Sequence, residues 1–356
     1  MPNTLHSGPE KINWRYKISA EVSLFILLII LIAGLAGCSQ HHQNKSISFN
    51  RKKPAHIIYD ADIGPDYDDV GAITILHVLA DKGEAKILAT VASNKYKGVA
   101  GVLDVFNTYF NRPDIPIGVP KGQALSMSDP QHWSDTLLAK YPHKIKYNRQ
   151  VPGAVQVYRK VLSKQPDHSV TIETEGFLTN LAQLLASKGG KYSPLSGREL
   201  VKKKVKLLVS MAGKFPSGKE WNMSQDAQSS IQVFEHWPTP VIFSGAKIGS
   251  KIKTGLPLIH DQNVHHDPAK DVFSICIPMN PADSAGRSSW DETAVLVAVR
   301  GYKPYWTLHQ GKVIISSDGS DKWDNNGSGQ YYLVPKESPE KVQKVINKLM
   351  MQTPKK

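Results

Sequence analysis

The stretch from Ala55 to Leu76, AHIIYDADIGPDYDDVGAITIL, decides the fold class of this chain. It opens with the apolar run HIIY, which predicts a short buried strand, and after the Gly-Pro turn at 64–65 its apolar residues recur every three or four positions, which predicts a helix. Strand, turn and helix form the repeating unit of α/β proteins. The turn also gathers five carboxylates: Asp60, Asp62, Asp66, Asp68 and Asp69.

The same alternation continues along the chain. Further strands are predicted at 85–93, 115–119, 169–174, 204–213 and 240–245, and further helices at 99–110, 153–164, 178–188, 226–237 and 338–350. Strands that are apolar at nearly every position must be covered on both faces. We therefore expect one α/β domain over residues 54–352, with a mostly parallel, open Rossmann-like central sheet and helices on both faces.

The first residues have the layout of a bacterial secretory signal. Lys11, Arg15 and Lys17 precede the apolar run 22–37, which ends in the sequence LAGC at 35–38. Small residues directly before a cysteine resemble a lipoprotein processing box. This predicts that residues 1–37 are a signal peptide, that Cys38 is lipidated, and that the protein is anchored to a bacterial membrane, facing the periplasm or exterior.

A single N-terminal membrane anchor is the alternative, although the apolar run is slightly short for a span of about 20 residues. Residues 38–53 are polar and without apolar periodicity, so we interpret them as a tether. The formal net charge of +13 comes from lysines that are scattered apart from the clusters 51–53 and 202–206, and no nucleic-acid-binding motif accompanies them. The basic balance therefore predicts a solvated surface, and no nucleic-acid partner.

The acidic turn needs a compensating positive charge, because crowded carboxylates repel one another. A helix N-terminus favours one or two of them, and turn and cap chemistry can account for part of the set. Oxygen ligands at this density suit a hard cation, with Ca²⁺ favoured over Mg²⁺. The sequence therefore predicts a metal site at the end of the first strand.

Five motifs carry a resemblance to a known family. They are DADIGPDYDD at 60–69, TVASN at 90–94, EGFLTNLA at 175–182, EWN at 220–222 and WDETAVLVAV at 290–299. In this order they resemble the signatures of the inosine-uridine-preferring nucleoside hydrolases. The first motif has about two additional residues between its aspartate pairs, and this longer spacing resembles that of a nucleoside hydrolase-like branch of the family.

The resemblance implies calcium-dependent hydrolysis of the N-glycosidic bond of ribonucleosides or related ribosides by a metal-activated water. It implies that Asp62 is the catalytic base and that Ca²⁺ is held by Asp62, Asp69, Asp291 and the backbone carbonyl near Glu175. It implies that the sugar is bound by Asp68, Asn94, Glu220 and Asn222. Asn180 is instead expected to serve the turn in which it lies.

Trp290 departs from the family pattern, because the family usually places a histidine before the last metal ligand. Tryptophan can stack on a base but supplies no proton to a leaving group. His265 and His266 precede Asp267 in a stretch that imitates the family string, and we expect them to be loop residues without an apolar helix after them. The segment 316–330 is rich in Gly, Asp and Asn and is expected to be a surface loop.

Two alternatives stand beside the hydrolase. One is a lipoprotein that binds a sugar or nucleoside without turnover, which the missing histidine allows. The other starts from Asp60-Ala-Asp62, which resembles the nucleophile motif of haloacid dehalogenase-like phosphatases but leaves the later motifs unexplained. The partner expected in the hydrolase interpretation is a small-molecule ribonucleoside or riboside, and a homo-oligomer is compatible with the sequence.

Overall fold

The computed structural model describes residues 47, 49 and 53–355. Residues Phe49–Lys356 form one compact unit. The predicted signal peptide, Cys38 and most of the predicted tether lie outside the described residues. Within the described part, no helix has both the length and the apolar character needed to cross a membrane.

A ten-stranded sheet runs through this unit in the order β3-β2-β1-β4-β5-β7-β12-β10-β11-β6. Neighbouring strands are parallel from β3 as far as β12 and antiparallel from β12 to β6. The strands are β1 (Ala55–Ala61), β2 (Ala85–Ala92), β3 (Ile117–Gly118), β4 (Val170–Thr174), β5 (Val205–Ser210), β6 (Ser217–Lys219), β7 (Val241–Phe243), β10 (Trp306–Ile315), β11 (Ser320–Asp324) and β12 (Gln330–Pro335). A second, two-stranded sheet joins β8 (Lys253–Thr254) and β9 (Arg287–Ser288).

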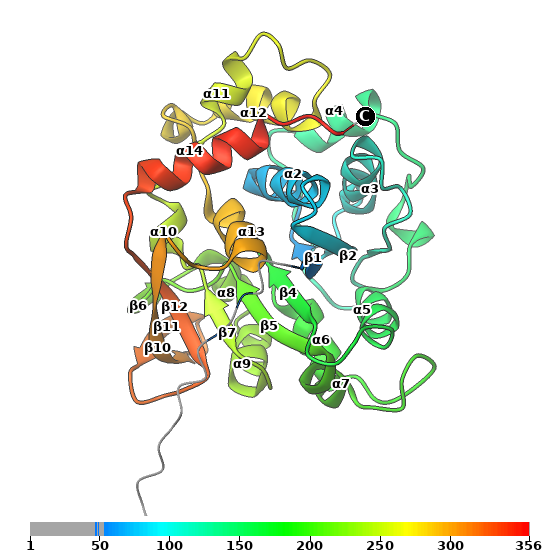
Figure 1. Cartoon of the computed structure of the whole chain (residues 1–356). Helices are drawn as coiled ribbons and strands as arrows, with labels where there is room; N and C mark the ends of the chain where they lie inside the picture. The colour runs from blue at the N-terminus through cyan, green and yellow to red at the C-terminus, as the bar shows by residue number, and fades with distance from the viewer. Residues whose placement is uncertain (1–46, 48, 50–52, 356) are drawn as a thin grey trace, which may run out of the picture. The chain divides into compact units, whose positions relative to one another are not determined.

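Helices cover both faces of the sheet (Figure 1). One layer holds α2 (Asp68–Asp81), α13 (Trp290–Arg300) and α14 (Pro339–Met350), and the other holds α5 (Ala154–Leu162), α6 (Thr179–Ala186), α7 (Gly197–Lys204) and α9 (Ala227–His236). The remaining helices are α3 (Val99–Tyr109), α4 (Trp133–Lys140), α8 (Trp221–Gln225), α10 (Ala246–Gly249), α11 (Leu256–His260) and α12 (Pro268–Met279). Ile57 and Ile58, which point to opposite faces of β1, are both fully buried. The predicted α/β class, with its mostly parallel sheet, is confirmed.

Two local predictions were wrong. The segment 316–330 is not only loop, because it contains β11, whose Trp323 is buried against Phe215 and Phe243. Its glycines form the turns on either side of the strand, and their abundance concealed the strand between them. A helix also follows Asp267, whose side chain accepts a hydrogen bond from the N–H of Lys270 and so caps α12.

The helix α2 contains a buried histidine that couples stability to pH. His77 is fully buried, stacks on Phe110 and hydrogen-bonds to Asn107. Burial lowers the pKa of His77 from its ordinary value of 6.5 to about 3, and the positive charge of Arg112 acts in the same direction. The unfolded chain therefore takes up a proton below pH 6.5 that the folded chain refuses until about pH 3, so stability falls as the pH falls through this window.

We expect His77→Gln to weaken the pH dependence of stability. Between pH 6.5 and pH 5 the wild-type protein should lose about 2 kcal/mol through this residue, at about 1.4 kcal/mol per pH unit, and the variant should not. Urea unfolding at both pH values measures the difference. The matched control is His309→Gln, since His309 is exposed on β10. An unchanged pH dependence in His77→Gln would contradict the argument.

Candidate functional site

A cavity of about 630 Å³ opens at the carboxyl ends of the central strands. Asp62 follows β1, Glu175 follows β4 and Met211 follows β5. In open parallel sheets this edge is where ligands bind, and the volume lies within the range of about 300–1,000 Å³ usual for small-molecule sites. The cavity is lined by Pro65, Asp66, Asp68, Glu175, Met211, Lys214, Lys219, Glu220, Trp221, Asn222, Ala246, Lys247, Ser250, Arg287, Trp290 and Asp291.

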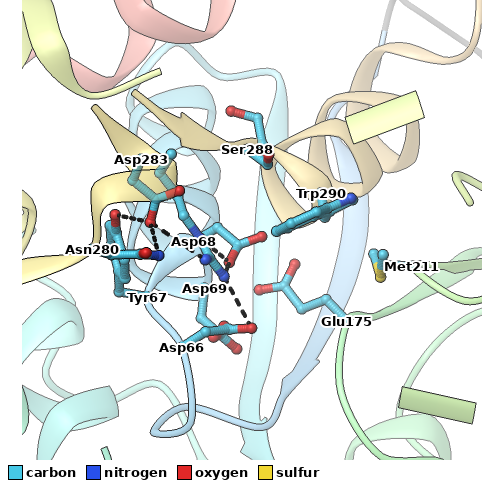
Figure 2. Close-up of polar contacts among 12 residues, drawn as sticks. Asp66, Tyr67, Asp68, Asp69, Glu175, Met211, Asn280, Asp283, Ser288 and Trp290 are labelled. Carbon is cyan, nitrogen blue, oxygen red and sulfur yellow. Dashed lines mark hydrogen bonds and ion pairs between the residues drawn. The ribbon is translucent and has the colours of Figure 1, made fainter. Parts of the chain in front are cut away.

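Carboxylates from three distant segments meet at this cavity, where Asp66, Asp68, Glu175 and Asp291 form its acidic floor, whereas Asp62 and Asp69 are buried and are not among the lining residues. The oxygens of all these carboxylates form three overlapping groups, each within 4.8 Å: Asp62, Asp66 and Asp69; Asp66, Asp68 and Asp291; and Asp69, Glu175 and Asp291. In Figure 2, the Glu175 side chain points toward Asp66, Asp68 and Asp69 from the other side of the site. The structure thus brings together the metal ligands expected from the sequence and adds the side chains of Asp66 and Glu175 to them.

Two glycines allow this convergence. A Cβ at Gly71 in α2 would lie 2.1 Å from the carboxylate of the fully buried Glu292, so the missing side chain makes room for Glu292 of α13 against α2, next to Asp291. A Cβ at Gly176 would lie 2.5 Å from the backbone nitrogen of Asp62. The β1 and β4 ends therefore touch, which places Glu175 beside the acidic turn.

Asp60 does not belong to the acidic cluster. It is fully buried and accepts hydrogen bonds from Tyr158 (2.7 Å) and Asn180 (3.1 Å). Residues two apart in a strand project to the same side, which would place Asp60 with Asp62, but β1 ends at Ala61 and its side-chain alternation does not continue to Asp62. Asn180 was expected only to stabilise the turn in which it lies, but its side-chain amide also donates to the Asp60 carboxylate. A phosphatase would need Asp60 as an accessible nucleophile, so its burial and full hydrogen bonding argue against that alternative.

The electrostatics of the cluster favour a bound cation. Burial, followed by the charge of neighbouring carboxylates, raises the pKa of Asp62, Asp69, Asp291 and Glu175 well above the ordinary range. Among the described residues, one oxygen each of Asp62, Asp69 and Glu175 is buried and has no hydrogen-bond partner. Buried acceptors without donors are costly. An oxygen-loving cation placed among them would remove both the repulsion and the missing contacts, so the donor set fits a hard metal ion.

Arg287, which the sequence analysis missed, is the positive partner within this site. Its guanidinium donates to Asp68 Oδ1 through Nε (3.0 Å) and Nη2 (2.6 Å), and Nη2 lies 3.1 Å from Asp66. Burial acts to lower the pKa of Arg287, but the charges of these carboxylates raise that pKa well above its usual value. Burial raises the pKa of Asp68 to about 6 while Arg287 lowers it. A lone arginine in β9 gives no sequence signal, because only the fold brings it to residues 66–68.

The residues expected to bind sugar hydroxyls are not all at the cavity. Glu220 and Asn222 line it, and Glu220 accepts the N–H groups of Asn222 (2.8 Å) and Met223 (3.0 Å), while Asn222 donates to the carbonyl of Glu175 (3.0 Å). Asn94 is not among the lining residues. It is fully buried, and its amide holds the backbone of Met127 and Tyr96.

Trp290 lines the cavity next to Asp291. Its indole N–H donates to the carbonyl of Ala246 (2.9 Å), which fixes the ring, and the Arg287 guanidinium lies 5.0 Å from the ring. The indole N–H of Trp290 is therefore already used. His265 and His266 lie in a loop, as predicted, and neither lines the cavity.

Comparisons with known proteins agree with this geometry. The plant nucleoside hydrolase PpNRh1 has a similar structure, with a TM-score of 0.65, 17% identity, and coverage of 84% of this chain and 99% of that chain. The purine-preferring ribonucleoside hydrolase from Gardnerella vaginalis has a TM-score of 0.65 and 16% identity, with coverage of 83% of this chain and 98% of that chain. The inosine-uridine preferring nucleoside hydrolase from Bacillus anthracis has a TM-score of 0.62 and 14% identity, with coverage of 83% of this chain and 99% of that chain. At such low sequence identities, these structural similarities establish the fold of the chain and nothing more.

No curated protein matches the chain in sequence. Residues 57–345, however, match the family described as inosine-uridine preferring nucleoside hydrolase, and that range spans most of the chain and includes the whole acidic cluster. The chain therefore belongs to the inosine-uridine preferring nucleoside hydrolase family, and it is an N-glycoside hydrolase.

Proposed function

We propose that this protein hydrolyses the N-glycosidic bond of ribonucleosides or related ribosides and that the reaction depends on Ca²⁺. The observation that carries the proposal is that Glu175 and Asp291, which line the cavity, meet the buried Asp69, from three separate segments and with unpartnered oxygens on Asp69 and Glu175. The cost of assembling buried carboxylates is difficult to explain in a site that only binds a sugar. Family membership likewise favours the hydrolase over a lipoprotein that binds without turnover.

The donor set determines which ion we propose. Asp62, Asp69, Asp291 and Glu175 would hold it, and all of them offer oxygen. A set of several carboxylates with no histidine or cysteine suits Ca²⁺, which takes six to eight oxygen ligands in flexible geometry. When bound, the ion would supply a lowered pKa and a fixed position for the water that attacks the sugar.

The side chains of the site divide the remaining work. Asp62 accepts the proton of the attacking water, because its unpartnered oxygen faces no protein donor. Asp68, oriented by Arg287, is directed toward sugar hydroxyls, together with Glu220 and Asn222. The carboxylates also favour a ribosyl carbon that becomes positive as the bond to the base breaks. Trp290 forms a flat wall on which a base can stack.

Removal of the metal tests this function. We expect release of reducing sugar from a nitrophenyl riboside to fall to background after dialysis against a chelator and to return when Ca²⁺ is added. Thermal unfolding without the ion should also occur at a lower temperature, since the carboxylates are then uncompensated. Full activity in the presence of excess chelator would contradict calcium dependence.

A matched pair of variants gives this experiment its control. Asp291→Asn removes one charged member of the cluster, so it should require a higher Ca²⁺ concentration for half-maximal activity. Asp129→Asn changes a carboxylate that is also buried but lies outside the acidic groups, and whose Oδ2 accepts the N–H of Ser134. Its calcium requirement should equal that of the wild-type protein.

We also propose that the protein is a lipoprotein, on the basis of the LAGC sequence at 35–38. Cys38→Ser should prevent lipid attachment and leave residues 1–37 uncleaved, whereas an anchor helix would be indifferent to that change. Membrane fractionation and mass analysis of the N-terminus measure both effects. Cys276→Ser is the control, because Cys276 is buried in α12. A mature wild-type protein that retains residues 1–37 would contradict the lipoprotein proposal.

A further inference from the structure

Three lysines line the mouth of the cavity whose floor is acidic. Lys214 lies in the loop after β5, Lys219 ends β6 and Lys247 lies in α10. All three are exposed, as is Trp221, which is 41% exposed and lines the same cavity. Three separate segments therefore contribute an ammonium group to one opening.

These lysines are not counter-ions of the acidic floor. In the part of the chain that the structure describes, the ion pairs of Asp66 and Asp68 are all made by Arg287. Lys219 makes a long contact of 3.7 Å with Asp318, while Lys214 and Lys247 make no ion pair with a described carboxylate. Neutralisation of the floor therefore does not explain why the lysines are there.

Packing against β6 also holds Lys214, one of the three lysines, in position. A Cβ on Gly218 would lie 2.7 Å from the Lys214 Cβ, so the Lys214 stem is packed across the backbone of β6. One oxygen of Asp321 accepts the backbone N–H of Lys214 (3.0 Å). Burial raises the pKa of Asp321, while this hydrogen bond and the positive charges of Lys247 and Lys214 act to lower it. The mouth thus combines positive charge with an exposed aromatic ring.

The separation of charge along the cavity selects the ligand. We propose that the substrate is a riboside bearing a phosphate group, with its sugar at the acidic floor and its phosphate between Lys214, Lys219 and Lys247; this rests on the proposed function. A phosphate is repelled by the carboxylates and attracted by the ammonium groups, so the two ends of the cavity orient the molecule. Lysine binds phosphate as a flexible point charge, which suits a group held at an open rim.

Calorimetric binding in the presence of Ca²⁺ tests this inference with three probes: ribose, ribose 5-phosphate and glycerol phosphate. We expect ribose 5-phosphate to bind about tenfold more tightly than ribose, since two or three exposed charge pairs contribute about that much. Added salt should reduce the advantage. Glycerol phosphate, which lacks the ribose, should bind more weakly than ribose 5-phosphate.

The variant Lys214→Gln/Lys247→Gln should lose the preference for ribose 5-phosphate and keep the affinity for ribose. Lys322→Gln is the matched control, because Lys322 is exposed and follows Asp321 on β11, so it faces the other side of the strand. It should change neither affinity.

Each outcome separates the two proposals. Equal binding of ribose and ribose 5-phosphate would overturn the phosphate inference and leave the hydrolase intact. Binding of glycerol phosphate as tight as that of ribose 5-phosphate would overturn the claim that the ligand is a riboside. Failure of all three probes to bind in Ca²⁺ while the nitrophenyl riboside is still hydrolysed would overturn the phosphate inference alone, whereas loss of both binding and hydrolysis would overturn the proposed function.

Discussion

Asp62→Asn is expected to reduce kcat for a nitrophenyl riboside by about 10³-fold at saturating Ca²⁺, because a positioned general base contributes about 10²–10⁴-fold. The asparagine keeps the shape of the side chain but cannot accept the proton of the attacking water. Saturation with Ca²⁺ separates this effect from weakened ion binding, which the same change should also cause. Initial rates over a range of Ca²⁺ concentrations measure the two effects.

Asp60→Asn is the matched control for that experiment. It lies two residues earlier, is also fully buried, and is held by Tyr158 and Asn180 outside the acidic cluster. We expect this variant to keep kcat within about tenfold and to lose stability instead, because it alters a buried hydrogen-bond network. If Asp60→Asn lost activity while Asp62→Asn remained active, the roles assigned to the two aspartates would be wrong.

A nitrophenyl riboside is expected to be hydrolysed faster than inosine by several powers of ten. Trp290 stands where the family usually has a histidine, and its indole N–H is committed to Ala246, so this position supplies no proton to a poor leaving group. Each 1.4 kcal/mol of missing leaving-group stabilisation slows the reaction about tenfold. The nitrophenyl group departs without that help. Comparison of kcat/KM for the two substrates measures the effect.

Trp290→His tests the cause of this gap. A histidine at that position introduces a donor beside Asp291, so the ratio between the two substrates should become smaller. Trp290→Phe retains an aromatic wall without a donor and should leave the ratio as in the wild-type protein. If wild-type rates on the two substrates were similar, another group would have to stabilise the leaving base. Arg287, whose guanidinium lies 5.0 Å from the Trp290 ring, would then be the first to replace.

Arg287 also affects the interpretation of metal binding. It is 8% exposed and pairs with Asp68 and Asp66, so part of the negative charge at the floor is neutralised before any ion arrives. A bound cation would therefore share the acidic cluster with Arg287 rather than compete with it for every carboxylate. This division would leave Asp291 and the unpartnered oxygens of Asp62, Asp69 and Glu175 as the donors to a cation.

The sequence by itself determined the features that depend on neighbouring residues. Apolar runs and three- or four-residue spacing identified strands β1, β2, β3, β4, β5 and β7 and helices α2, α3, α5, α6, α9 and α14, since every such element must bury a continuous face. The parallel strand β12 and the helix α7 were not predicted. The acidic turn was recognised because Asp62, just after β1, and Asp69, in the first turn of α2, lie close together in the chain. The strand-end rule then placed them at the edge where ligands bind, and the resemblance supplied Asp291.

Only the tertiary structure decided which distant groups meet. Arg287, 219 residues from Asp68 in the chain, lies beside it because β9 lies at the rim of the site. Asp60 turns into the protein because Tyr158 and Asn180 supply its donors there, and Asn94 is engaged by the loop around Met127. The strand β11 was missed because its pairing with β10 and β6, not local composition, makes it a strand. The spacing of apolar residues within a segment indicates which face of that segment is buried. The distances between segments depend on the order of strands in the sheet and on helix packing, which no short stretch of the sequence specifies.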